Sequence, residues 1–278
     1  MKRVLYFLLA LLPAMGLYAY DFKYGDLYYN ITSDSTVEVT YQGDGWRSQN
    51  YPGLSSASIP DVVTGDDGIA FRVTSIGKKA FYLCESLTSV TMSNSVTSIG
   101  ESAFSGCRNL TSVIIPNNVT NIGYKAFSGT PLYDNQPDGL VYFGKVLYKY
   151  KGAMPNNTSI NIPEGIVGIA SGAFKDCTGL IAVTIGNDVT TIEGGGWDDY
   201  DREYGVFANC TNLTSVIIGK GVKSIGSMVF YGCDSLKSVH YRGTIADWVD
   251  IDFGGYRNSI HHFDADENIG ANPLEVCR

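Results

Sequence analysis

Residues 103–115 read AFSGCRNLTSVII, and three other stretches of the chain repeat this pattern. The copies are AFYLCESLTSVTM (80–92), AFKDCTGLIAVTI (173–185) and VFANCTNLTSVII (206–218). Isoleucines outside the copies keep a fixed interval, because Ile76, Ile99 and Ile122 lie 23 residues apart, as do Ile169 and Ile192. A fixed period of this length predicts a solenoid, in which each coil buries its apolar side against the next coil.

Two intervals exceed one period, and the extra residues predict insertions between whole coils. Ile122 and Ile169 lie 47 residues apart, one more than two periods, and Ile192 and Ile225 lie 33 residues apart. The ten extra residues of the second interval, 194–203 (GGGWDDYDRE), have the composition of a surface loop. The first interval holds an insertion at 131–157, in which the alternating run 139–152 predicts a β-hairpin.

The segment LxxVxI occurs in five copies and predicts one β-strand per coil. Successive strand side chains point to opposite faces, so the Val and Ile side chains point inward and their neighbours outward. Stacked coils then form a parallel β-sheet on one face, with strands about 4.8 Å apart. The Ala-Phe pair before each cysteine predicts a column of buried phenylalanines beneath a helical turn. These features together predict an α/β solenoid with a period of about 23 residues.

The motifs AFxxCxxLTSVxIP and VTSIG resemble the BspA-type leucine-rich repeats of bacterial surface proteins, especially those of the Bacteroidetes. The resemblance covers nearly the whole chain after residue 19. It implies an N-terminal β cap (20–72), a repeat solenoid (73–241) and a C-terminal cap (242–278). The chain stops soon after residues 272–274, where the resemblance implies a further strand, so the C-terminal cap is expected to be incomplete. A shortened gene, a change of reading frame and a distinct ending are the alternatives. Members of this family are implicated in adhesion and partner binding and share no catalytic residues.

The first 19 residues have the pattern of a secretory signal peptide. Lys2 and Arg3 precede an apolar run, 4–12, which is too short to span a bilayer of about 30 Å, and the expected cleavage follows Ala19. No membrane span is expected once this segment is removed. The pattern predicts a secreted or cell-surface protein, and a periplasmic location also fits.

The chain is acidic, with 28 Asp and Glu residues against 20 Lys and Arg residues and a formal net charge of −8. Removal of residues 1–19 takes the charge to −10, because that segment contains two basic residues and no acidic one. No basic cluster interrupts the acidic sequence, so nucleic acid is not an expected partner.

Five of the six cysteines occupy the same position of the repeat: Cys84, Cys107, Cys177, Cys210 and Cys233. Thr130 fills that position in another copy, so a small buried side chain suits it and free thiols are expected. Disulfides between neighbouring coils, such as Cys84 with Cys107, are the alternative. No CxxC or HxxxH pair occurs, and neither a metal site nor a cofactor is expected.

The outward positions of the predicted sheet form a flat face of small, uncharged side chains. One column contains Ser89, Ser112, Ser159, Ala182, Ser215 and Ser238, and the column beside it contains Thr91, Ile114, Asn161, Thr184, Ile217 and His240. Such a face suits an extended peptide or a glycan, with Ile114 and Ile217 as exposed apolar contacts. The alternative is that Ser and Thr are ordinary residues of a β-sheet surface without a ligand.

The inserted loop combines aromatic and acidic residues, and Trp197, Asp198 and Tyr200 are its candidate ligand-binding residues. Aromatic rings with carboxylates can grip sugars or order a loop around Ca²⁺, although the spacing is not that of an EF-hand. A solvated surface loop without a ligand is the alternative.

No catalytic motif is visible, since GxSxG, Walker and GxGxxG patterns are absent and the three histidines have no nucleophile motif beside them. The sequence therefore predicts an exported, noncatalytic protein of the adhesion type, which binds a protein or glycan outside the cell. A purely structural module of the cell envelope is one alternative, and an enzyme with an unrecognised site is another.

Overall fold

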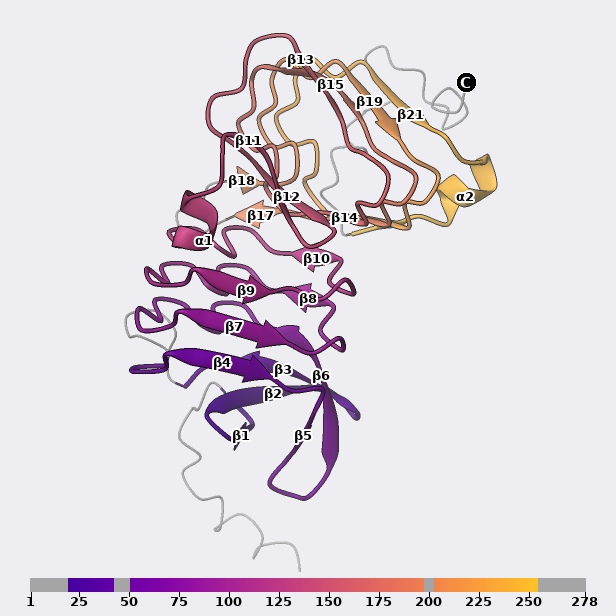
Figure 1. The fold of residues 1–278 in the computed structure, drawn as a ribbon. Helices are drawn as coiled ribbons and strands as arrows, with labels where there is room; N and C mark the ends of the chain where they lie inside the picture. Colours follow the sequence, from indigo (N-terminus) through magenta and orange to yellow (C-terminus); the bar gives the residue numbers. More distant parts are fainter. Residues whose placement is uncertain (1–19, 43–50, 198–202, 255–278) are drawn as a thin grey trace, which may run out of the picture.

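The computed structural model describes residues 20–42, 51–197 and 203–254. The expected signal peptide and much of the expected C-terminal cap lie outside these residues. The described chain winds into a stack of coils, each with three sides (Figure 1). Two sides carry parallel strands, which we call the first face and the second face, and the third carries the Ala-Phe turns, which we call the turn side.

The first face consists of the LxxVxI strands and their neighbours in register. Its three-stranded sheet contains β4 (Ser56–Ile59), β7 (Ser89–Met92) and β9 (Ser112–Ile114), and its four-stranded sheet contains β13 (Thr158–Asn161), β15 (Leu180–Thr184), β19 (Ser215–Ile218) and β21 (Ser238–Tyr241). Inward side chains such as Val90, Val183 and Val216 are buried. The expected single sheet is wrong in one respect, because in the described chain β9 does not pair with β13.

The second face is built at the VTSIG motif, where the sequence did not predict strands. Its strands are β6 (Ala70–Ile76), β8 (Ser98–Ile99) and β10 (Asn121–Ile122) in the first half, and β14 (Gly168–Ile169), β16 (Thr191–Ile192), β20 (Ser224–Ile225) and β22 (Asp252–Phe253) in the second half. Ile99 pairs in register with Ile76 on one side and Ile122 on the other. The isoleucines recur every 23 residues because each one pairs in register with the isoleucine of the next coil in this second sheet.

Antiparallel strands close the N-terminal end of the stack. The strands β1 (Phe22–Tyr24), β2 (Leu27–Ser33) and β3 (Thr36–Thr40) pair antiparallel, and β3 then pairs parallel with β6. The strand β5 (Val62–Thr64) pairs antiparallel with β6. The Phe22 and Tyr29 rings stack at 5.5 Å beneath these strands, which covers the apolar end of the solenoid.

The Ala-Phe segments on the turn side are turns, so the predicted helical turn is wrong. Along each turn, backbone N–H groups alternate between donating to a carbonyl of their own coil and donating to a carbonyl of the next coil. The Tyr82 N–H donates to Lys79 O of its own coil at 3.0 Å, whereas the Phe81 N–H donates to Ala103 O of the next coil at 2.7 Å. The positive φ of Leu83 (56°) suits this alternation. A helix would satisfy every N–H internally, so these turns provide a third ladder of bonds between coils.

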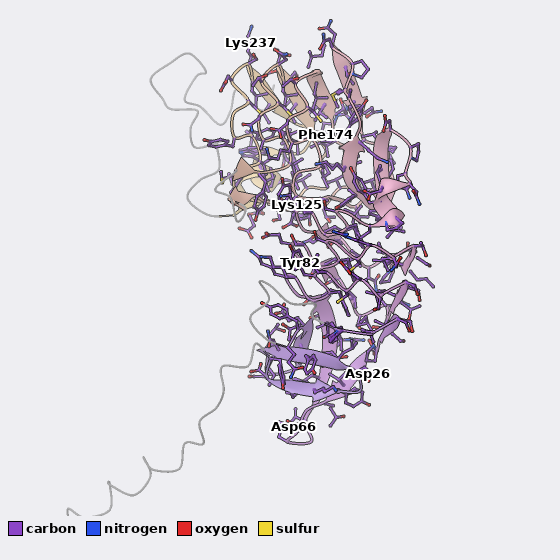
Figure 2. The ribbon with its side chains drawn as sticks, turned by 90° about the vertical axis from the view of Figure 1, so that its left-hand side faces the viewer. Asp26, Asp66, Tyr82, Lys125, Phe174 and Lys237 are labelled. Atoms are coloured by element: carbon purple, nitrogen blue, oxygen red, sulfur yellow. The ribbon has the colours of Figure 1, made fainter. Side chains whose placement is uncertain are left out.

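The phenylalanines of these turns stack in two columns, as Phe81, Phe104 and Phe127 and as Phe174, Phe207 and Phe230. Ring centroids within the columns lie 5.1 to 5.4 Å apart, with interplanar angles of 3° to 7°. Figure 2 places Phe174 inside the second half. The predicted aromatic column is confirmed, although it is divided in two. Burial of each ring contributes about 1.5 to 3 kcal/mol to stability.

A hairpin separates the two columns. The strands β11 (Gly139–Phe143) and β12 (Val146–Lys151) pair antiparallel, and β12 also pairs parallel with β14. Val146 and Tyr148 pack in the core of the first half, whereas Leu147 packs in the core of the second half. In Figure 1 the coils of the first half stack upward and those of the second half stack sideways, so the axis of the solenoid turns at this hairpin.

The described chain contains two short helices, both outside the repeated turns. They are α1 (Pro131–Asp134) and α2 (Ile245–Val249), and the hydroxyl groups of Thr130 and Thr244 cap their N-termini. Neither they nor any other described segment forms a helix long and apolar enough to cross a membrane.

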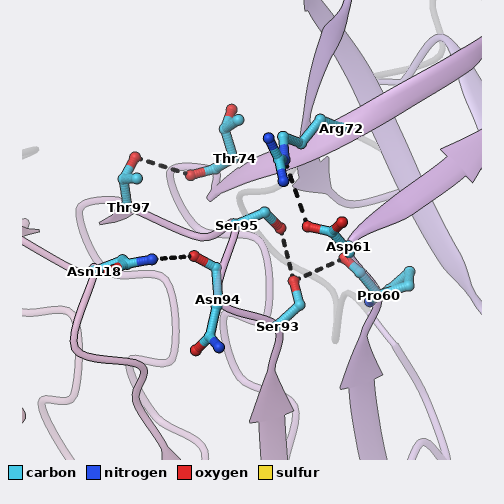
Figure 3. A network of polar contacts seen from close by, with 9 residues as sticks. All are labelled: Pro60, Asp61, Arg72, Thr74, Ser93, Asn94, Ser95, Thr97 and Asn118. Carbon is cyan, nitrogen blue, oxygen red and sulfur yellow. Dashed lines mark hydrogen bonds and ion pairs between the residues drawn. The ribbon is translucent and has the colours of Figure 1, made fainter.

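Polar side chains at the edges of the faces bind the preceding coil. In Figure 3 the Thr97 hydroxyl donates to Thr74 O at 3.3 Å, and Asn118 Nδ2 donates to Asn94 O at 2.7 Å. The Ser93 hydroxyl donates to Pro60 O at 3.1 Å in the same region. The Thr at this motif position is structural in two coils, because the hydroxyl groups of Thr97 and Thr190 each satisfy a carbonyl group of the coil before.

The five described cysteines are free and buried, which confirms the expectation for these residues, and Cys277 lies outside the described chain. The thiols of Cys107, Cys210 and Cys233 donate to the carbonyl oxygen of the phenylalanine one coil earlier, at 3.0 to 3.1 Å. Burial raises the pKa of Cys177 to about 11 and that of Cys233 to about 12. The thiols of Cys177 and Cys233 are therefore protonated at neutral pH and pack as small apolar groups.

Candidate functional site

The outward positions of the first face form two pairs of columns, one pair in each sheet. The register aligns Ser56, Ser89 and Ser112 beside Ser58, Thr91 and Ile114 in one sheet, and Ser159, Ala182, Ser215 and Ser238 beside Asn161, Thr184, Ile217 and His240 in the other. None of these positions carries a formal charge, although 17% of the chain is charged. The structure thus divides the predicted sheet-face residues between two separate uncharged surfaces.

The two isoleucines of the first face differ in exposure. The side chain of Ile114 is 61% exposed on β9, which is the last strand of its sheet. Ile217 is half-buried on β19, between Thr184 and His240 in register. The expectation of two exposed isoleucines therefore holds for Ile114 and is wrong for Ile217, because strands flank Ile217 on both sides.

The insertion after β16 starts and ends as a short antiparallel ribbon. Its strands are β17 (Gly196–Trp197) and β18 (Glu203–Tyr204). Asp198 and Tyr200 lie outside the described residues. The insertion leaves the coil from the second face, directly after β16, so the structure does not join Trp197 to the predicted sheet-face residues in one site.

A hollow of about 660 Å³ lies on the second face, where the axis of the solenoid turns. Coils from both halves line it with the residues that directly follow β8, β10, β14, β16, β20 and β22. Backbone of Gly100, Gly123 and Gly226 forms part of this lining. The lining thus combines the backbone of these glycines with a few side chains, among them Tyr124 and Tyr204.

Two stacked tyrosines connect the insertion to the first half at this hollow. The rings of Tyr124 and Tyr204 lie 4.4 Å apart with an interplanar angle of 5°. The Tyr204 hydroxyl donates to Glu101 Oε2 at 3.2 Å, and Lys78 forms an ion pair with the same carboxylate at 2.9 Å. The lysine ammonium of Lys125 lies 4.9 Å from the centroid of the Tyr124 ring. This side of the hollow is therefore aromatic, and the charge of Glu101 is paired.

Glu193 breaks a column of small residues at the same hollow. The residue after the second-face strand is Gly77, Gly100, Gly123, Ala170, Gly226 or Gly254 in the other coils, and it is Glu193 after β16. A Cβ on Gly100 would come within 2.6 Å of Lys78 N, which explains the preference for glycine. The carboxyl of Glu193 is largely buried, and its Oε2 atom has no hydrogen-bond partner among the described residues. Burial raises the pKa of this carboxyl.

Serine hydroxyls fix the backbone beside Glu193. The Ser171 hydroxyl donates to Gly194 O, and the Ser227 hydroxyl donates to Gly195 O at 3.0 Å. These bonds hold the start of the insertion against the coils before and after it. Glu193 and Tyr204 were not predicted as site residues, although the departure of Glu193 from the repeated glycine is visible in the sequence.

Comparison with known proteins identifies a family. The family described as "BspA type Leucine rich repeat region" matches residues 74–195 and 202–270 in six copies. No curated protein matches the chain. Among solved structures, a leucine-rich repeat protein from Bacteroides ovatus is 30% identical, with a TM-score of 0.41, over 80% of this chain and 53% of that one. This chain thus spans about half the length of that protein.

Two other solved structures are similar at lower identity. The leucine-rich repeat protein of T. pallidum is 22% identical over 91% of this chain and all of that one, with a TM-score of 0.37. A leucine-rich repeat protein from Bacteroides capillosus is 20% identical over 80% of this chain and 97% of that one, with a TM-score of 0.33. The six matched repeats and the parallel strands that they form place this chain in the BspA-type leucine-rich repeat family.

Proposed function

We propose that this protein is an exported, noncatalytic binding protein of the adhesion type, which presents its first face to a protein or glycan outside the cell. Membership of the BspA-type family suggests a binding or adhesion-type role. The observation that carries the proposal is the absence of formal charge at every outward position of both first-face sheets, in a chain with 48 acidic and basic residues.

The physical argument concerns desolvation. A charged side chain loses favourable hydration when a ligand covers it, whereas small hydroxyl-bearing side chains lose little and can bond to the ligand. Ile114 adds an exposed apolar contact at the end of the first sheet. A flat face of this kind suits a ligand that lies along the strands, and such ligands include extended peptides and glycans.

The proposed function is tested by screening the purified protein against extracellular-matrix proteins and glycans, with wild type and two variants. The double variant Ser112→Glu and Ser215→Glu places a carboxylate on each first-face sheet, and Asn117→Glu adds one to an exposed turn outside the strands. We expect the double variant to lose at least tenfold in affinity, about 1.4 kcal/mol, and Asn117→Glu to bind as wild type.

The same screen separates the proposal from a structural role. A screen without any ligand, together with cell-envelope proteins that co-purify with the chain, would support a structural module instead. Export is tested separately by treating intact cells with protease and following the loss of the protein. Protection of the protein in intact cells would contradict a surface location.

A further inference from the structure

The strand β9 has a free edge at the break of the first face. In a coil of the second half, the backbone at this edge bonds to the next coil, as where the Ile185 N–H donates to Ile217 O at 2.8 Å. Ile115 stands at the repeat position of Ile185, and its N–H has no partner among the described residues. Within the described chain, β7 is the one strand that pairs with β9.

The register shows which backbone groups face this free edge. In a parallel ladder, alternate residues direct both their N–H and their C=O groups to the same neighbour. The Ser112 N–H donates to Thr88 O of the preceding coil at 3.3 Å, so Ser112 and Ile114 face β7. The N–H and C=O groups of Val113 therefore point to the free edge, as does the Ile115 N–H. Unpaired backbone groups in this arrangement are a template for another extended backbone.

The side chains along the free edge are apolar and incompletely covered. Val113 is half-buried, whereas Val183 and Val216 at the same repeat position are 2% and 0% exposed. Ile115 is also half-buried, and Ile114 is 61% exposed. In the other coils the next strand covers these positions, so an added strand at β9 would bury apolar surface.

Other parts of the chain bound the free edge at both ends. The Leu132 N–H of α1 donates to Leu110 O at 2.9 Å, and in Figure 1 α1 lies above the start of β9. At the other end, a Cβ on Gly144 of the hairpin turn would lie 3.4 Å from Ile115 Cγ2. The open length covers residues 111–114, about 13 Å at about 3.3 Å per residue, which suits a strand of about four residues.

The strand on the other side of the break, β13, offers less to a ligand. Its outward residues Ser159 and Asn161 are polar and exposed, and its apolar residue Ile160 is half-buried. The exposed apolar side chain and the bounded length are thus found together at β9.

We propose that an extended peptide segment of a partner protein pairs with the free edge of β9 as an added strand. Its backbone bonds to Val113 and to the Ile115 N–H, and an apolar side chain of the peptide covers Val113. A glycan lacks N–H and C=O groups that alternate at strand spacing, so this edge selects a peptide. The inference rests on the function proposed above, and it narrows the ligand to a peptide and the site to β9.

The test begins with a phage-displayed library of random ten-residue peptides, panned on the purified protein, and the tightest binder is synthesised as the probe. We expect it to bind wild type and to lose at least tenfold in affinity for Val113→Pro. Proline removes an N–H at the free edge, and edge strands accept proline where the N–H faces away from the ladder. Ser159→Pro is the matched control, because it removes an N–H at the free edge of β13, and it should bind as wild type.

Methylated probes test the backbone pairing without changing the protein. Two forms of the selected peptide carry N-methyl groups at alternate residues, one at the odd and one at the even positions. Because one of these two sets of N–H groups faces β9, one form should bind at least tenfold more weakly than the other. Thermal melts show whether each protein variant is folded, and if Val113→Pro is not, the methylated forms decide.

The proposal is overturned if panning yields no binder, if folded Val113→Pro binds the probe as wild type, or if the two methylated forms bind equally. The function proposed above fails separately, when its own screen of matrix proteins and glycans yields no ligand. A ligand from that screen that loses affinity for Ser112→Glu and Ser215→Glu but binds Val113→Pro as wild type would retain the first face and overturn the added strand.

Discussion

The hydroxyl of Tyr204 donates a hydrogen bond to Glu101 Oε2 at 3.2 Å and so joins two residues that lie 103 positions apart in the chain. Tyr204 ends the inserted ribbon of the second half, and Glu101 follows a second-face strand of the first half. The bond thus crosses the turn of the solenoid axis. It connects the insertion to the first half beside the hollow and fixes the Tyr204 ring against the Tyr124 ring.

Replacing Tyr204 with Phe removes this bond and keeps the stacked ring. Because Glu101 keeps its ion pair with Lys78, we expect a loss of about 1 kcal/mol in the free energy of unfolding. Urea denaturation measures the change. Tyr24→Phe is the control, since Tyr24 is 46% exposed, and it should leave the midpoint unchanged. Equal midpoints for wild type and Tyr204→Phe would show that the bond across the turn contributes nothing.

Replacing Glu193 with Gln should stabilise the protein at neutral pH. Burial raises the folded-state pKa of the carboxyl above its unfolded value, so this group favours the fold most below the unfolded pKa, near 4.3. That contribution is lost as the pH rises through the folded pKa. Thermal melts between pH 4 and pH 8 should therefore show a gain for Glu193→Gln that grows with pH. A gain that is constant across this range would mean that Glu193 does not titrate abnormally.

The phenylalanine column predicts a large cost for Phe104→Ala. The Phe104 ring is fully buried and stacks on Phe81 at 5.1 Å and on Phe127 at 5.4 Å. Its removal leaves a cavity between three coils, so we expect a loss of about 3 to 5 kcal/mol in the free energy of unfolding. Chemical denaturation measures it, and Phe104→Leu should lose less because it fills part of the cavity. A midpoint unchanged by Phe104→Ala is incompatible with a stacked core.

The glycine column predicts different effects for one substitution at two coils. A Cβ on Gly100 would lie 2.6 Å from Lys78 N, whereas a Cβ on Gly254 would lie 3.4 Å from its nearest neighbour, Gly226 Cα. Gly100→Ala should therefore lose about 1 to 3 kcal/mol, because the coils must move apart, and Gly254→Ala should be nearly neutral. Thermal melts of both variants decide this. Similar melting temperatures would mean that the coils separate at no cost.

Much of this fold is predictable from periodicity, and what is not predictable depends on contacts between coils. The spacing of LxxVxI and of the phenylalanines predicts parallel strands and a stacked aromatic core, because those side chains point inward in every coil. The sequence of one repeat does not distinguish these turns from helices. The difference arises because backbone N–H groups such as that of Phe81 donate to a carbonyl of the next coil and not within their own coil. The break after β9 likewise depends on how the hairpin packs between two cores.

The candidate sites were less predictable than the fold. The outward residues of the first face follow from strand alternation, but their division between two sheets and the half-buried state of Ile217 do not. The hollow brings Glu101 and Tyr204 together across the turn of the axis, and no local pattern marks that contact. Glu193 is the exception, since its place in a column of glycines can be read from the repeat alignment alone.

Hydrogen exchange of the protein, with and without the partner found in the matrix and glycan screen, shows which face the partner covers. A partner that binds the first face slows exchange in β7, β9, β15 and β19 and leaves exchange on the turn side unchanged. Protection confined to the turn side, with these four strands exchanging as in the free protein, would contradict binding to the first face.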